Sequence, residues 1–206
     1  LYQDQSRYEQ AEAAYNRALT IREKALGTEH PDIATTLDNL AGLYRDSGRY
    51  GEAEPLLKRA MAIREKALGA DHPATAMSWS SLAELERAQG HYAGAEDAYK
   101  HALAIKESAL GPDNPAVAAS LNGLSLLLRL QGRYAEAEPL LQRVVSVLET
   151  AYGRDHPGTA TALGNLAGLY QEQGRYTNAE ADFKQSLERL ERGLEPGHPT
   201  IALALN

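Results

Sequence analysis

The chain has 206 residues, of which 43% are apolar, 24% charged and 6% aromatic, and its formal net charge is −7. This composition is typical of a helical protein with enough apolar residues for a core, and the acidic balance argues against a general nucleic-acid binder. No apolar run approaches the roughly 18 residues of a membrane span. The absence of cysteine excludes disulfides and thiolate metal sites.

A unit of 42 residues recurs along the chain, and two registered series of residues mark it. The first series is a proline that follows histidine or asparagine, at His30-Pro31, His72-Pro73, Asn114-Pro115, His156-Pro157 and His198-Pro199. The second is a glycine and a basic residue before tyrosine, at Gly48-Arg49-Tyr50, Gly90-His91-Tyr92, Gly132-Arg133-Tyr134 and Gly174-Arg175-Tyr176. We therefore expect a single array over residues 1–206, with a partial repeat at 1–30, full repeats at 31–72, 73–114, 115–156 and 157–198, and a partial first helix at 199–206.

In chain order, residues 1–30 predict the second helix of an incomplete unit. The first full unit then predicts a helix over 31–47, because proline is favoured at the first helical position, where His30 becomes the N-cap, and Gly48 ends the helix. A second helix runs from Tyr50 until Gly69 ends it. The same two helices follow in each later unit, so the predicted fold class is all-α.

The apolar residues of each predicted helix recur at helical spacing and form one stripe. In the first helix these are Ile33, Leu37, Leu40, Ala41 and Tyr44; in the second, Ala53, Leu56, Leu57, Ala60, Met61, Ala67 and Leu68. Alanine recurs at one place of the second helix, which predicts a close approach of two helices there, at Ala11, Ala53, Ala95, Ala137 and Ala179. One helix pair cannot bury its stripe alone, so the pairs must stack on their neighbours.

Three residues depart from the repeat. Glu86 stands where other units have tyrosine or leucine, which predicts local looseness or a salt bridge. Arg189 replaces an apolar residue near the end of the last full unit, which suggests a polar cap. Trp79 takes the place of a stripe leucine, and we interpret it as a core residue rather than a platform for a ligand.

The order of stripe residues, Leu37, Leu40, Ala41, Tyr44, Gly48, Tyr50, Ala53, Leu57 and Ala60, resembles the tetratricopeptide repeat. The longer segments GRYGEAEPLLKRAMAIREKALGADHP and DNLAGLYRDSGRY resemble the extended repeats of kinesin light chains and their bacterial relatives. The resemblance implies a solenoid, a right-handed superhelix of antiparallel helix pairs whose first helices line a concave groove. It does not imply a motor subunit, because such repeats also occur in other bacterial proteins, including signalling ATPases.

The resemblance also implies a peptide-binding groove on the face of the first helices opposite the apolar stripe. Asn39 and Asn165 match the groove asparagines that bond a ligand backbone in relatives, whereas Ser81 and Gly123 stand at that place in the middle units. Arginine recurs at 45, 87 and 129, either to receive carboxylates of an acidic peptide or to pair with neighbouring acidic residues. The predicted groove residues are Thr35, Asp38, Asn39, Arg45, Ser81, Glu84, Arg87, Asn122, Leu126, Arg129, Thr161, Asn165 and Gln171.

Neither metal binding nor catalysis is predicted. The repeated histidines lie one repeat apart, about 10 Å or more in stacked helices, whereas zinc bonds nitrogen at roughly 2 Å. The chain contains no phosphate-binding glycine loop, zinc-protease motif or nucleophile elbow, so we expect no cofactor and no enzyme activity.

The leading hypothesis is a cytoplasmic protein-interaction module that holds a peptide segment of a partner, with no nucleic acid and no membrane involved. Two alternatives stay open. The array is the sensor of a larger signalling ATPase or protease, or it is a structural spacer that self-associates through truncated ends. The chain begins and ends inside a repeat, which suggests a fragment of a longer protein.

Overall fold

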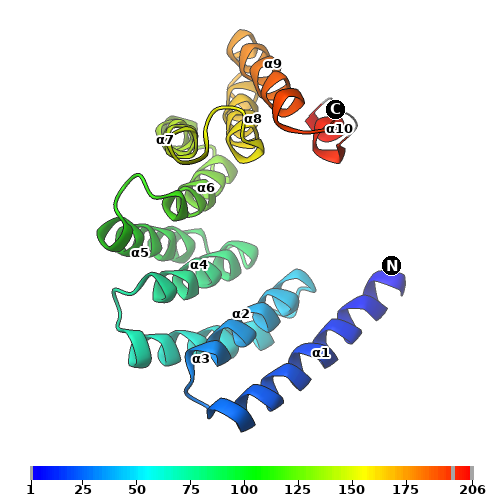
Figure 1. The fold of residues 1–206 in the computed structure, drawn as a ribbon, viewed down its shortest axis with the longest axis vertical. Helices are drawn as coiled ribbons and strands as arrows, with labels where there is room; N and C mark the ends of the chain where they lie inside the picture. Colours follow the sequence, from blue (N-terminus) through cyan, green and yellow to red (C-terminus); the bar gives the residue numbers. More distant parts are fainter. Residues whose placement is uncertain (1, 196–197, 205–206) are drawn as a thin grey trace. The chain divides into compact units, whose positions relative to one another are not determined.

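The computed structural model describes residues 2–195 and 198–204, and every regular element in those ranges is an α-helix (Figure 1). The prediction of an all-α fold built from repeated helix pairs is confirmed. None of the described helices combines the length and the apolar character that crossing a membrane requires. The helices are α1 (Tyr2–Leu26), α2 (Pro31–Asp46), α3 (Tyr50–Leu68), α4 (Pro73–Ala88), α5 (Tyr92–Leu110), α6 (Pro115–Leu130), α7 (Tyr134–Tyr152), α8 (Pro157–Glu172), α9 (Tyr176–Gly193) and α10 (Pro199–Ala204).

The helices form two compact units, residues 1–109 and 110–206. In unit 1, α2 packs against α1, α3 and α4, and in unit 2 α7 packs against α6 and α8, while α9 packs against α8 and α10. The extension of one array over all 206 residues stays a prediction.

The first helix of each pair begins as the sequence predicts. Pro31 opens α2, and the ring nitrogen Nδ1 of His30 accepts a hydrogen bond from the backbone N–H of Asp32 at 3.2 Å. This bond satisfies one of the donors that a helix start leaves without an intrahelical partner. The same cap recurs at His72, Asn114, His156 and His198.

Helices α1 to α8 are each followed, within two residues, by a glycine with positive φ. Gly48 has a φ of 76°, and its N–H donates to the carbonyl of Arg45 at 2.9 Å, while the N–H of Arg49 reaches the carbonyl of Tyr44 at 2.8 Å. These two bonds form a Schellman motif, which glycine favours because it adopts positive φ without strain. Helix α2 therefore ends at Asp46, one residue before the predicted end. Glycines with positive φ follow one another every 21 residues, at Gly27, Gly48, Gly69, Gly90, Gly111, Gly132, Gly153 and Gly174.

The core of unit 1 lies where α2 meets α3 and α4. Ala53 is fully buried there, and the equivalent Ala95, Ala137 and Ala179 are also buried, whereas Ala11 is half-buried. The close approach of two helices at these alanines stays a prediction. The end of α3 differs from the prediction, because Ala67 and Leu68 point to solvent, with Leu68 38% exposed. The buried residues of the α2, α3 and α4 contact are Leu40, Ala41, Tyr44, Ala53, Leu57 and Leu85, and a neighbouring cluster of α2 and α3 contains Ile33, Ala34, Leu37, Ala60 and Ile63.

The three departures from the repeat are accommodated locally. Glu86 contacts His91 Nδ1 at 3.0 Å, which is the predicted salt bridge when the histidine is protonated. Trp79 packs half-buried beside the core of α4 and α5 and stacks on His101, with the ring centroids 4.7 Å apart. Arg189 is buried and bonds Glu149 at 2.7 Å, so this position is paired within unit 2 rather than solvated.

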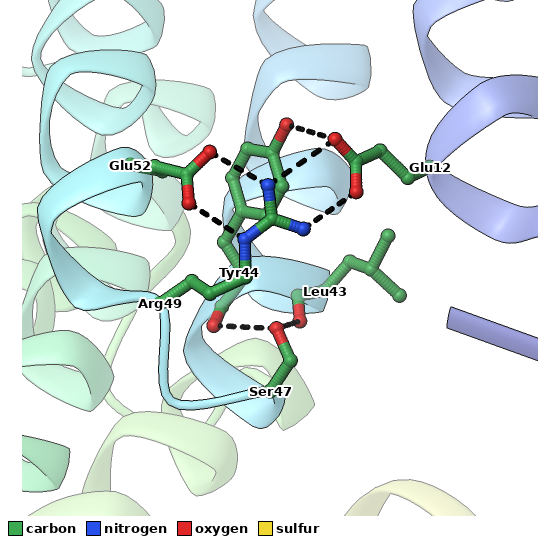
Figure 2. Close-up of polar contacts among 6 residues, drawn as sticks. All are labelled: Glu12, Leu43, Tyr44, Ser47, Arg49 and Glu52. Carbon is green, nitrogen blue, oxygen red and sulfur yellow. Dashed lines mark hydrogen bonds and ion pairs between the residues drawn. The ribbon is translucent and has the colours of Figure 1, made fainter. Parts of the chain in front are cut away.

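A polar cluster surrounds Arg49, the arginine of the repeat marker Gly48-Arg49-Tyr50. Figure 2 shows the Arg49 guanidinium between two carboxylates, that of Glu52 on α3, bonded twice at 2.6 Å, and that of Glu12 on α1, at 2.6 and 3.3 Å. The guanidinium also lies 4.3 Å from the ring centroid of Tyr44, whose hydroxyl donates to Glu12 at 2.9 Å. One arginine therefore joins α1, α2 and α3.

Unit 2 repeats most of this cluster. Arg175 bonds Glu138 at 2.7 Å and lies 4.2 Å from the ring centroid of Tyr170, whose hydroxyl donates to Glu138 at 3.2 Å. In both clusters the carboxylate comes from the helix before the pair, so the cluster fastens the pair of α2 and α3 to α1, and the pair of α8 and α9 to α7.

Candidate functional site

Five of the seven predicted groove residues of unit 1 gather around one concave pocket of about 400 Å³. Seven of the lining residues belong to α2, one to α1, two to α4 and one to α3. Five predicted groove residues line it, namely Thr35, Asp38, Asn39, Arg45 and Ser81, together with Tyr15, Gly42, Leu43, Asp46, Arg64 and Met77.

A buried ion pair lies at this pocket. Arg64 of α3 bonds the Oδ2 atom of Asp38, donates to Ser78 Oγ at 2.5 Å, and reaches Thr35 Oγ1 at 3.4 Å. The side chains of Arg64 and Asp38 are only 3% and 11% exposed. Burial raises the pKa of the Asp38 carboxyl more than the neighbouring Arg64 guanidinium lowers it. The pair positions Asp38, since removing either partner would leave a buried charge uncompensated.

The rest of the pocket presents free polar groups and open space. Asn39 is exposed and makes no hydrogen bond with the described residues, so its amide can both donate and accept toward a ligand. Ser81 faces it from α4. Gly42 of α2 lines the same pocket. A Cβ atom built on Gly42 would have no neighbouring heavy atom within 4 Å. A ligand can thus approach the α2 backbone closely at Gly42.

The three predicted groove arginines are each paired within the chain. Arg45 bonds Asp46 at 2.8 Å, Arg87 bonds Glu84 at 2.6 Å, and Arg129 bonds Glu172 at 2.6 Å. This is the alternative of pairing with neighbouring acidic residues. An acidic ligand would have to displace these carboxylates.

The remaining predicted residues lie outside this pocket. Glu84 of α4 accepts a short hydrogen bond from the Tyr99 hydroxyl, and burial together with this bond raises the pKa of Tyr99. Thr161 donates to the carbonyl of Pro157 at 2.9 Å, which ties it to its own helix. Leu126 is 40% exposed on α6. Also outside it are Arg87, Asn122, Arg129, Asn165 and Gln171, of which Asn122 and Asn165 are half-buried and Gln171 is exposed.

The predicted groove residues do not include six of the residues that line the pocket, namely Tyr15, Gly42, Leu43, Asp46, Arg64 and Met77. A signal for Arg64 exists, because a basic residue follows an isoleucine of the second helix at the same place in three units, as Arg22, Arg64 and Lys106. Arg22 and Arg64 reach a hydroxyl of the following helix, on Thr36 and Ser78, whereas Lys106 reaches Ser80 of the preceding helix at 3.5 Å. Tyr15 stands where the later units have Leu57, Tyr99, Leu141 and Phe183, so its place in the repeat indicates apolar packing and gives no signal for a binding role.

No group of three or more His, Asp or Glu side chains that would suit a metal ion occurs in the described part of the chain. The Nδ1 atoms of the capping histidines accept backbone hydrogen bonds instead.

Comparison with known proteins places the fold. A model of the tetratricopeptide repeat matches residues 1–66, 32–108, 95–150, 116–192 and 159–206. No curated protein sequence matches the chain.

Several solved structures are similar. BtubC from P. vanneervenii is 19% identical, with a TM-score of 0.80 over 96% of this chain and 82% of its own. A putative kinesin light chain of Podosopora anserina with nearly identical TPR-like repeats is 27% identical, with a TM-score of 0.71 over 93% and 90%. A Rap protein complexed with competence and sporulation factor is 17% identical, with a TM-score of 0.74 over 90% of this chain and 50% of its own.

Proposed function

Since the chain belongs to the tetratricopeptide repeat family, a family of generally non-catalytic scaffolds for protein–protein interaction, we propose that unit 1 binds an extended segment of a partner protein. The binding site is the pocket of α1, α2 and α4. The observation that carries this proposal is that five residues predicted from the repeat register line one pocket, where Asn39 keeps its amide free.

The chemistry of the pocket suits a peptide. Its volume of about 400 Å³ falls within the range of roughly 300–1,000 Å³ typical of ligand sites. The amide of Asn39 complements both the N–H and the C=O of a peptide bond, and Met77 and Leu43 supply apolar surface for side chains. The similar Rap protein, solved with competence and sporulation factor, is an example of this fold with a bound partner.

A display library of random peptides selected on the immobilised protein tests the proposal. The best peptide is then measured by fluorescence anisotropy against the parent, Asn39→Ala, Gly42→Leu and Asn16→Ala. Asn39→Ala should weaken binding about 2- to 12-fold for each hydrogen bond that it removes, whereas Gly42→Leu should abolish binding by filling the pocket.

Asn16→Ala is the matched control, because Asn16 is exposed on α1 and does not line the pocket. Melting curves should show that all variants remain folded. The proposal fails if the library yields no peptide, or if the selected peptide binds Gly42→Leu as tightly as the parent.

A further inference from the structure

Asp38 lines the pocket, and one of its carboxylate oxygens is buried without a partner. The Oδ2 atom is bonded to Arg64, but Oδ1 has no hydrogen-bond partner, and among the side chains that the structure describes no other buried polar atom is left so. A buried acceptor without a donor is unfavourable, and a ligand that supplies the donor gains that free energy on binding.

The surroundings of Asp38 define the ligand group that fits. A narrow cavity of about 30 Å³ adjoins the pocket, and Asp38, Gly42, Arg45 and Ser81 line both. The charged side chains of the pocket are two carboxylates and two guanidinium groups, in the pairs Asp38 with Arg64 and Asp46 with Arg45. These charges cancel, so a cationic ligand group would bring a charge with no counter-charge in the pocket. A neutral N–H donor brings no charge, so it fits the pocket better.

Gly42 adds an independent reason to expect a main-chain donor. It lies one helical turn from Asp38, and the space where its side chain would project is open. The equivalent residues of the next two repeats are Glu84 and Leu126, so helix packing at this position does not require glycine. Gly42 leaves room for the backbone of a bound segment beside Asp38.

We propose that Asp38 Oδ1 accepts a hydrogen bond from a main-chain N–H of the bound segment, so that the pocket selects at this point a residue that has an N–H and excludes proline. This inference rests on the proposed function. It makes Asp38 a binding residue, positioned by Arg64, and Gly42 the floor on which the ligand backbone lies.

An amide-to-ester scan of the library-selected peptide tests this contact, since an ester removes one N–H with little change of shape. One ester position should weaken binding to the parent about tenfold or more. The same ester should cost nothing in the double variant Asp38→Leu/Arg64→Met, in which an apolar pair replaces the buried ion pair. An ester penalty of equal size in parent and double variant overturns the inference.

A second measurement needs no substitution in the protein. The side-chain carboxyl ¹³C resonance of Asp38 should shift when the amide peptide binds the parent, and should shift much less with the ester peptide at saturation. Equal shifts with both peptides overturn the inference even if the double variant does not fold.

Gly42→Ala completes the test, with Gly51→Ala on α3 as its control. Both glycines are helical and have open space around a built Cβ atom, so alanine should raise the melting temperature in each. Only Gly42→Ala should weaken binding of the selected peptide. If the peptide binds the two variants with equal affinity, the role of Gly42 is contradicted. If Gly42→Leu abolishes binding while the ester penalty persists in the double variant, the pocket binds a peptide without the Asp38 contact, and the proposed function stands alone.

Discussion

The pKa values of two carboxyl groups of unit 1 are shifted in opposite directions by their surroundings. Burial raises the pKa of Asp38 against the opposing effect of Arg64. Hydrogen bonds from Arg49, and then from Tyr44, lower the pKa of Glu12. The first carboxyl lies at the pocket, and the second belongs to the cluster of Figure 2 that fastens α1 to the next helix pair.

These directions predict how each group contributes to stability as pH changes. The contribution of Asp38 is fully present below its unfolded pKa, about 3.9, and is lost as pH rises through the raised folded pKa. The contribution of Glu12 is present above its unfolded pKa, about 4.3, and is lost as pH falls through the lowered folded pKa. Carboxyl ¹³C NMR should place the Asp38 midpoint above and the Glu12 midpoint below the usual values.

Arg49→Met is the control for this titration. It removes the main donor to Glu12, so the Glu12 midpoint should return toward its usual value while that of Asp38 stays raised. The structural account is wrong if both groups of the parent titrate at their usual values.

Sequence reasoning identified those site residues whose role follows from their place in the repeat. Asn39 could be predicted because the repeat register puts it on the face opposite the apolar stripe. The partner of Asp38 could not, because Arg64 lies on another helix and its burial depends on how α3 packs behind α2. Arg64 carries a charge, and sequence patterns assign charged residues to solvent.

At the scale of a helix, the ends were the most predictable feature. Proline, an N-cap side chain and a terminal glycine act within a few residues of chain, so the packing of other helices hardly affects them. The exposed end of α3 was not predictable in the same way. Leu68 continues the apolar spacing, but no neighbouring helix covers it, and it remains 38% exposed.

The N-cap of α4 provides a test, because the equivalent N-cap residue of the next repeat is asparagine instead of histidine. His72 and Asn114 make the same bond to the backbone two residues later, at 3.1 and 2.9 Å. We expect His72→Asn to leave stability nearly unchanged at neutral pH, and His72→Ala to lower the free energy of unfolding by about 1 kcal/mol.

Trp79 makes this measurement specific, since it is the single tryptophan of the chain and lies on α4 itself. Urea unfolding followed by its fluorescence reports on unit 1. If His72→Ala unfolds at the same urea concentration as the parent, the side-chain cap does not stabilise α4.

At the scale of the whole chain, the repeat makes stability depend on complete helix pairs. Deleting residues 31–72 joins His30 to Pro73 and restores the marker of a repeat start. This variant should keep its helical content per residue and melt cooperatively at a lower temperature, because one stacked pair is lost.

Deleting only residues 31–51 removes α2 and leaves α3 without its partner. Circular dichroism should then show a loss of helix larger than the 21 residues removed, with a broad transition. Equal cooperativity of the two deletions would contradict the helix pair as the unit of folding.

The combination of Asp38 with Gly42 breaks the symmetry of the repeat. The corresponding residues of the later repeats are Ser80 with Glu84, Asn122 with Leu126, and Gly164 with Gly168. An extended segment that met identical positions in every repeat would be free to slide by one repeat between equivalent alignments. A segment that binds Asp38 and Gly42 as proposed has a single alignment on the repeats, so a place where the repeat is broken would fix the register of the partner.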